Sequence, residues 1–176
     1  GAAYAFDVSL ALGALFAAAT RIAAVVAERS EAEERALEDY GRNLGLAFQL
    51  VDDAIDYDSE TAEMGKGKGD DFRDGKMTLP VILAYARGNA EERQFWQDAI
   101  AGFCTEDEDL AHAVTLINRH DAVSATRERA RHYAQRAIDA IAGGADIAAH
   151  QLRADSFVVG RGAHRSAHGH AVGFRD

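Results

Sequence analysis

Residues 48–80 read FQLVDDAIDYDSETAEMGKGKGDDFRDGKMTLP, and the two parts of this stretch differ in character. The first ten residues are apolar or aromatic apart from one glutamine and three aspartates, and they contain no glycine or proline. Residues 59–77 collect glycine, lysine and acidic residues, which favour a loop. We therefore predict a helix that ends near residue 58, a loop over 59–77, and a new helix from about Leu79 with Pro80 in its first turn.

The composition of the whole chain is that of an all-α protein. Alanine dominates, Pro80 is the single proline, and runs of valine, isoleucine and threonine are scarce, so long helices are permitted almost everywhere. The helix that ends near residue 58 is predicted to begin at about residue 30. Further helices are predicted over about 6–28, 90–102, 106–118 and 121–142, the last one stopped by Gly143 and Gly144. At 176 residues the chain is long enough for one domain with a core of its own.

Three capping boxes indicate where helices begin. In each box a Ser, Thr or Asn is followed three residues later by Glu, so that side chains and backbone amides bond reciprocally. The boxes are Ser30 with Glu33, Asn89 with Glu92, and Thr105 with Glu108. In the helix after the first box, Gly41 and Gly45 lie one turn apart, which predicts that a neighbouring helix approaches closely there.

The C-terminal segment differs from the rest of the chain. We assign residues 1–150 to a helical domain and residues 151–176 to a disordered tail, because the tail has no lysine or glutamate, several glycines and no clear helical period. Its histidines, His164, His168 and His170, allow the alternative of a metal-binding tract, which the composition favours less.

The net charge of −10 argues against a nucleic-acid partner, because proteins that bind a phosphate backbone need a basic face. An anionic substrate is compatible with this charge only if metal ions intervene. The single cysteine, Cys104, rules out an internal disulfide and fits a reducing, cytoplasmic location. No apolar run reaches the roughly 20 residues that cross a bilayer. We interpret the apolar first 28 residues, which carry Asp7 and Arg21, as a core helix and not as a signal peptide.

The aspartates Asp52, Asp53 and Asp56 form a DDxxD motif on the predicted helix. Positions i and i+4 share a helix face, so Asp52 and Asp56 repel each other, and the macrodipole disfavours negative charge near the helix C-terminus. Both effects call for a cation, and carboxylate oxygens suit Mg²⁺ that is completed by water and substrate phosphates. The alternative is a solvated acidic face. However, the apolar residues before the motif predict a helix that is buried on nearly all sides.

Three lysines follow the aspartates within eleven residues, and the chain has no other lysine. They are Lys66, Lys68 and Lys76, and glycines lie between them. Ammonium groups on a glycine-rich segment suit a phosphate, because glycine permits close approach of the backbone. Acid, base and glycine together predict a clamp for a metal and a diphosphate, and the alternative is a solvated loop with neutralising lysines.

Taken together, these motifs resemble a known enzyme family. Residues 48–57 are similar to the second aspartate-rich motif of the trans-isoprenyl (polyprenyl) diphosphate synthases, and residues 65–80 resemble the loop that follows it. The ending GKMTLP over 75–80 is most like the long-chain octaprenyl and decaprenyl diphosphate synthases, which make quinone side chains. The resemblance covers about residues 14–142. It implies an all-α antiparallel or orthogonal helical bundle of the isoprenoid synthase type, incomplete at the N-terminus.

The resemblance also implies a role for each matching residue. Asp52 ligates Mg²⁺, Asp56 supports the same metal directly or through water, and Asp70 belongs to the metal shell. Asp53 is part of the motif, but the helix turns it about 100° away from Asp52, so it ranks lower as a metal ligand. The residues implied for the substrate are Lys66 and, more weakly, Lys76 at the allylic diphosphate, and Gln49 near the reacting allylic carbon.

The implied reaction condenses isopentenyl diphosphate with an allylic diphosphate to make a polyprenyl diphosphate. Mg²⁺ and lysine neutralise the departing diphosphate, the alkene of isopentenyl diphosphate attacks the allylic carbocation, and a proton is lost. Members of the family are usually homodimers built through helices.

Other features of the family have no match in the sequence. They include the first aspartate-rich motif and the basic residues that hold isopentenyl diphosphate, so we predict weak or no activity for this chain alone. A truncated or frame-shifted coding region would produce such a chain, and missing upstream helices would expose apolar surface that favours association. Two alternatives stay open on the sequence: a non-catalytic fragment or subunit of a synthase, and a helical interaction module without a ligand.

Overall fold

The structure, a computed structural model, describes residues 2–58, 69–102 and 106–143. Its labelled helices are α1 (Ala2–Val26), α2 (Glu31–Asp56), α3 (Asp70–Arg73), α4 (Leu79–Arg87), α5 (Ala90–Ile100) and α6 (Asp107–Arg119). A last helix follows over residues 122–143, and the described ranges contain no strand. The predicted all-α fold is confirmed, whereas the tail over 151–176 and Cys104 lie outside the described residues.

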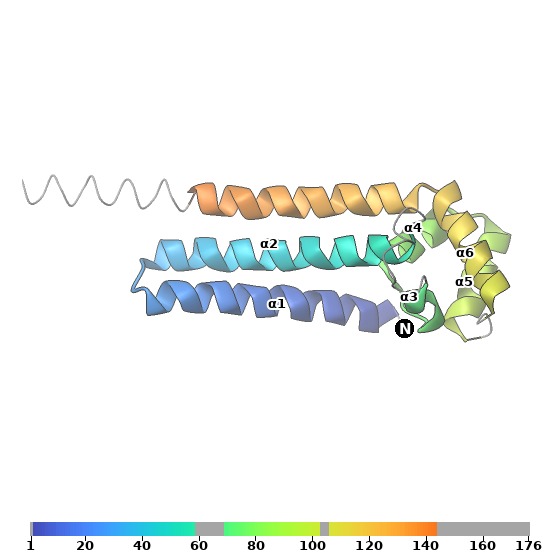
Figure 1. The fold of residues 1–176 in the computed structure, drawn as a ribbon, viewed down its shortest axis with the longest axis horizontal. Coiled ribbons are helices and arrows are strands. Elements are labelled where there is room, and N and C mark those ends of the chain that lie inside the picture. Colours follow the sequence, from blue (N-terminus) through green and yellow to red (C-terminus); the bar gives the residue numbers. More distant parts are fainter. Residues whose placement is uncertain (1, 59–68, 103–105, 144–176) are drawn as a thin grey trace, which may run out of the picture.

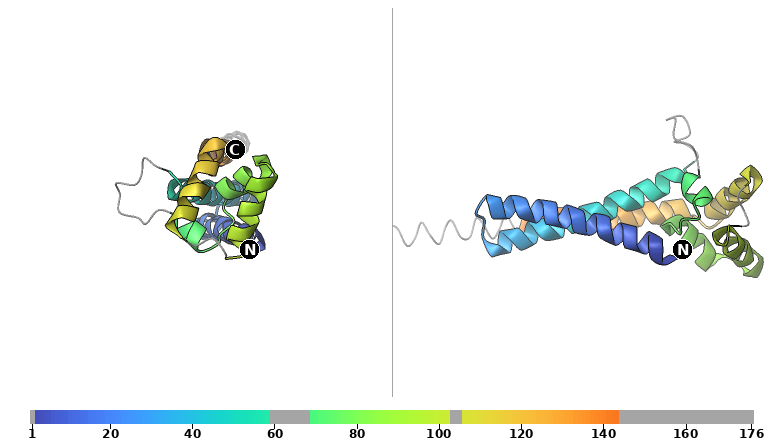
Figure 2. Two further views of the ribbon diagram at one scale, coloured as in Figure 1. Left: turned by 90° about the vertical axis from the view of Figure 1, so that its right-hand side faces the viewer. Right: turned by 90° about the horizontal axis from the view of Figure 1, so that it is seen from below.

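Two long helices form a hairpin, and the short helices gather at one end of it (Figure 1). α1 and α2 lie side by side and antiparallel, and the 122–143 helix runs along the same long axis. The end-on view in Figure 2 shows α4, α5 and α6 covering the end of the hairpin where α2 finishes. The aspartates of α2 therefore lie at the junction between the long hairpin and the short helices.

Two glycines of α2 set the distance between α1 and α2. A Cβ atom on Gly41 would lie 2.4 Å from the carbonyl oxygen of Phe16, and a Cβ atom on Gly45 would lie 2.9 Å from the Cα atom of Gly13. Both distances are shorter than real Cβ contacts, so neither position accepts a side chain while the helices stay in place. The predicted close approach of a helix at this glycine pair is confirmed, and the neighbouring helix is α1.

Two of the predicted capping boxes are present. The Ser30 side chain accepts the backbone N–H of Glu33, and the Glu33 carboxylate accepts the backbone N–H of Ser30. Asn89 and Glu92 are paired in the same way at the start of α5. The starts of these two helices were therefore predictable from the four-residue capping motifs alone, 30–33 and 89–92.

The start of α6 differs from the prediction by one residue. Its N-cap is Glu106, and the Asp109 carboxylate accepts the backbone N–H of Glu106. The expected cap, Thr105, lies outside the described residues. Because residues 106–109 are all acidic, the segment offers equivalent capping partners one residue apart, and its pattern does not distinguish between them.

The predicted loop over 59–77 contains a short helix, α3, at residues 70–73, so the loop prediction is wrong there. The cause is Phe72, which is buried and packs edge-on against Trp96 with ring centroids 6.4 Å apart. Gly69, at the N-cap of α3, has a left-handed backbone with φ 71°, and a side chain there would collide with Leu110. Pro80 lies in the first turn of α4, as predicted.

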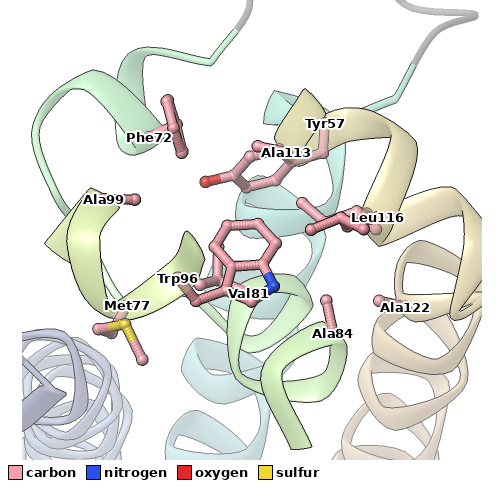
Figure 3. Close-up of a cluster of buried hydrophobic side chains, with 11 residues drawn as sticks. Tyr57, Phe72, Met77, Val81, Ala84, Trp96, Ala99, Ala113, Leu116 and Ala122 are labelled. Atoms are coloured by element: carbon pink, nitrogen blue, oxygen red, sulfur yellow. The ribbon is translucent and has the colours of Figure 1, made fainter. Parts of the chain in front are cut away.

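The main hydrophobic core lies at the end of α2. Figure 3 shows Trp96 at its centre, with Tyr57 and Leu116 close by. Tyr57 directly follows α2, Ala122 begins the 122–143 helix, and the other members of this core come from α3 to α6 and the turns beside them. The C-terminal end of α2 is therefore held in a packed environment, which gives the aspartates a fixed base.

The prediction that α2 is buried on nearly all sides is wrong. Phe48 is 58% exposed, and Val51 and Ile55 are also exposed. α1 packs along one side of α2 and the core covers only its end, so the described helices leave this apolar face open to solvent. The expected exposure of apolar surface is thus observed on α2 itself. None of the helices in the described part of the chain is long and apolar enough to cross a membrane.

Candidate functional site

The three aspartates of the DDxxD motif differ in their surroundings. Asp52 is exposed, Asp56 is half-buried, and Asp53 is only 6% exposed. All three lie in the last two turns of α2, so Asp52 and Asp56 share a helix face as predicted, and Asp53 lies about 100° from Asp52 around the axis. The fold therefore divides the motif into a pair near the surface and one inward side chain.

Asp56 lies against the segment that returns to α2 at residue 69. Its Oδ2 atom accepts the backbone N–H of Asp71 at 3.2 Å, and its carbonyl oxygen accepts the backbone N–H of Gly69 at 3.3 Å. Burial and the nearby negative charges of Asp71 and Asp70 raise the pKa of Asp56 to about 6. A bound cation would relieve this repulsion, so these carboxylate donors fit a divalent metal ion.

Asp53 is engaged inside the protein. Its Oδ1 atom accepts a hydrogen bond from Nε2 of Gln49 at 2.8 Å, and its Oδ2 atom lies 3.5 Å from the backbone nitrogen of Leu79, which donates to it. Burial raises the pKa of the Asp53 carboxyl, and the hydrogen bonds from Gln49 and Leu79 partly oppose this effect. The structure thus brings Gln49 and Asp53 together, one turn apart on α2.

Lys76 is paired within its own segment. Its Nζ atom lies 2.7 Å from Oδ1 of Asp71 and 3.1 Å from Oδ2 of Asp74. These hydrogen bonds, first of all that to Asp71, raise the pKa of Lys76. A diphosphate would have to compete with two carboxylates for this ammonium group. The stronger candidate, Lys66, lies outside the described residues.

Asp70, the fourth predicted metal ligand, is the first residue of α3, and its carboxylate lies 3.8 Å from the Arg73 guanidinium. Its side chain is largely exposed. Among the described residues, no group of three or more His, Cys, Asp or Glu side chains is arranged to hold a metal ion. Mg²⁺ usually takes one or two protein carboxylates and fills its other positions with water and phosphate, so the open arrangement of these aspartates suits it.

Two residues at the site, Asp71 and Asp58, make contacts that were not anticipated from the sequence. Asp71 belongs to the glycine-rich segment and had no predicted role, yet its backbone bonds Asp56 and its carboxylate pairs with Lys76. Asp58 forms an ion pair with Arg127 of the 122–143 helix. Arg127 is 69 positions away, and no local pattern predicts such a pair. The only signal was that Asp58 lies just beyond a predicted buried helix, where a charge needs a partner.

Comparison with solved structures identifies the class of fold. A decaprenyl diphosphate synthase from Rhodobacter capsulatus matches with a TM-score of 0.69 and 44% identity, over 74% of this chain and 40% of that chain. A polyprenyl synthase from Caulobacter crescentus CB15, complexed with calcium and isoprenyl diphosphate, matches with a TM-score of 0.67 and 48% identity, over 73% and 39%. The predicted helical bundle of the isoprenoid synthase type is therefore confirmed.

Comparison with known sequences identifies the family. The family model for polyprenyl synthetase matches residues 2–117. The octaprenyl diphosphate synthase of Haemophilus influenzae is 42% identical over 127 residues, which are 72% of this chain and 38% of that protein. The octaprenyl diphosphate synthase of Escherichia coli is 37% identical over 131 residues, with coverages of 72% and 39%. The chain belongs to the polyprenyl synthetase family, as its motifs indicated, and it spans about two-fifths of the length of these relatives.

Proposed function

We propose that this chain supplies the second aspartate-rich half of a Mg²⁺-dependent prenyltransferase site. The reaction would condense isopentenyl diphosphate with an allylic diphosphate and give a polyprenyl diphosphate of the kind used for quinone side chains. The observation that carries the proposal is the pair Asp52 and Asp56 at the fixed end of α2, directly beside the returning segment over 69–79. The family relationship supports the chemistry, and the long-chain relatives support the product class.

The proposed roles follow the surroundings of each residue. Asp52 and Asp56 would hold Mg²⁺ with Asp70 nearby, and Mg²⁺ when bound would offset the charge on the leaving diphosphate. Lys66 is proposed, from its motif alone, to bind the same diphosphate. Gln49, half-buried on α2, would lie near the allylic carbon. When the allylic C–O bond breaks, the alkene of isopentenyl diphosphate forms the new C–C bond, and the proton that it loses goes to the released diphosphate.

The family relationship favours neither alternative that the sequence left open, a non-catalytic fragment or subunit and a helical module without a ligand. A homodimer fits the exposed apolar face of α2 around Phe48 and Val51.

A cytoplasmic location stays a prediction from the cysteine content. Because no segment of this chain matches the first aspartate-rich motif, we expect weak or no chain elongation by this chain alone.

The test is calorimetric titration of the chain with a non-hydrolysable allylic diphosphate analogue, with and without Mg²⁺. Asp52→Ala removes a proposed ligand, and Asp39→Ala is the matched control on the same helix, about 20 Å away at 1.5 Å per residue. We expect binding that needs Mg²⁺, is lost in Asp52→Ala and is kept in Asp39→Ala. Absence of binding in the folded wild-type chain would contradict the proposal, as would binding of the analogue by Asp52→Ala that is as tight as binding by the wild type.

A further inference from the structure

Asp53 differs from the other two aspartates of its motif because its carboxylate is turned into the protein. It is buried, and both of its oxygen atoms are engaged, Oδ1 with Nε2 of Gln49 and Oδ2 with the backbone N–H of Leu79. Asp53 is buried and lies about 100° around the helix from the exposed Asp52, so its carboxylate is turned away from the side of α2 where Asp52 would hold a metal.

The contact with Leu79 is made at the start of a helix. Leu79 is the first residue of α4, where backbone N–H groups have no partner within the helix. Thr78, the N-cap of α4, makes no side-chain capping hydrogen bond, and Pro80 has no N–H to be satisfied. The carboxylate of Asp53 therefore takes the place of a local cap and meets the positive end of the α4 dipole, from a position 26 residues earlier in the chain.

Asp56 holds the opposite end of the same segment. It accepts the N–H groups of Gly69 and Asp71, while Asp53 accepts that of Leu79. The segment over 69–79, which carries two of the predicted diphosphate and metal residues, is therefore tied to α2 at both of its ends.

We infer that Asp53 is a positioning residue and not a metal ligand: it holds the N-terminus of α4 on α2 and fixes the orientation of the Gln49 amide. A carboxylate only accepts hydrogen bonds, so Gln49 presents its NH₂ group to Asp53, and its carbonyl oxygen is directed elsewhere. The importance of Gln49 for the reaction rests on the proposed function. The tie between Asp53 and α4 does not.

The test uses nuclear magnetic resonance on the full 176-residue chain, with Asp53→Asn and Asp52→Asn as matched variants. They remove the same charge one residue apart, but an asparagine at 53 has a single carbonyl oxygen and loses one of the two contacts. This hydrogen bond is long at 3.5 Å, so its loss predicts exchange of the Leu79 amide that is faster by about twofold to fivefold. If the Gln49 contact is lost instead, the Gln49 side-chain NH₂ resonances shift. In Asp52→Asn neither signal changes.

A second measurement keeps the inference testable if Asp53→Asn does not fold. In the wild-type chain, the amide of Leu79 exchanges more slowly than that of Ala90, which holds the same first position in α5. There the capping side chain of Asn89 accepts from Glu92 rather than from Ala90. Equal exchange of the two amides would overturn the inference.

Titration with Mn²⁺ separates positioning from ligation. Asp52→Asn loses Mn²⁺ binding at concentrations that saturate the wild-type chain, and Asp53→Asn retains it. Loss of binding in Asp53→Asn as severe as in Asp52→Asn would overturn the inference, as would Leu79 and Gln49 signals that stay unchanged in Asp53→Asn. If the wild-type chain binds no Mn²⁺, the proposed function fails, and the exchange measurement still decides the role of Asp53.

Discussion

Gly41→Ala should destabilise the chain even though alanine is the better helix former. Alanine is favoured over glycine in a helix interior by about 1 kcal/mol. At Gly41 the new Cβ atom would lie 2.4 Å from the carbonyl oxygen of Phe16 and 2.3 Å from Oγ1 of Thr20. Ordinary contacts begin at 3.4 Å, and a backbone oxygen cannot rotate away, so α1 has to retreat. Overpacking costs about 1–3 kcal/mol, and a clash with a backbone atom belongs in the upper half of this range. After subtraction of the propensity gain of about 1 kcal/mol, we expect a net loss of about 1–2 kcal/mol.

The matched control is the same substitution at Gly13, on the facing helix of the same contact. A Cβ atom there would have its nearest neighbour, the carbonyl oxygen of Arg42, at 3.5 Å, which is ordinary contact. Gly13→Ala should therefore keep the helix-propensity gain of up to about 1 kcal/mol. Urea unfolding and thermal unfolding, both followed by circular dichroism, measure the stability of both variants. In thermal unfolding, 1 kcal/mol corresponds to about 2–4 °C in melting temperature at this size. A Gly41→Ala chain as stable as the wild type would refute the reasoning.

Three further predictions concern charged groups. Glu92→Gln lowers the unfolding midpoint, because Glu92 caps α5 and pairs with the end of α6, whereas Glu91→Gln at the exposed neighbour does not. The pKa of Glu92 is lowered to about 2, mainly by its hydrogen bond with the N-cap backbone, so its contribution is complete above about pH 4.5 and is lost as the pH falls towards 2. Without metal, Asp56→Asn raises the melting temperature near neutral pH, since burial raises the pKa of Asp56 to about 6 and disfavours its ionised form. Lys76→Gln weakens binding of the diphosphate analogue less than Lys66→Gln, because Lys76 is already paired with two carboxylates.

Each of these predictions has an outcome that contradicts it. For Glu92, equal urea midpoints in the two glutamine variants would remove the argument for the α5–α6 contact. For Asp56, the stability gain of the asparagine variant must shrink as the pH falls from about 6 towards 4, because the wild-type carboxyl then becomes protonated in the folded state. A gain that is independent of pH would point to another cause. For Lys76, a loss of affinity as large as that of Lys66→Gln in calorimetry would show that the diphosphate displaces Asp71 and Asp74.

Features that act within one or two helical turns were predictable from the sequence. The capping boxes at Ser30 and Asn89 depend on residues three positions apart, and the pair Gly41 and Gly45 marks one helix face. Even so, the sequence did not identify α1 as the helix that approaches this face. The partner depends on the tertiary arrangement, which a local pattern does not contain.

Features that depend on distant contacts were missed. Phe72 lies in a polar, glycine-rich stretch, and its burial against Trp96 stabilises a helix that its neighbours do not indicate. Asp58 and Arg127 are far apart in sequence and meet only because the last helix returns to the end of α2. The prediction that α2 is buried on nearly all sides failed for the same reason. Its apolar residues show that it can be covered, but they do not show what covers it.

The spacing of the DDxxD motif fits the two proposed tasks through helical geometry. At 3.6 residues per turn, positions 52 and 56 lie about 40° apart around the axis, while position 53 lies about 100° from position 52. Asp52 and Asp56 can therefore face a common ligand, and Asp53 reaches Leu79 on the neighbouring α4. Carboxylates stabilise a charged ligand best when they do not have to reorganise, which requires a fixed helix end. The buried ring of Tyr57 and the tie from Asp53 to α4 both act at this end, so the residues that hold the motif lie within the motif and directly after it.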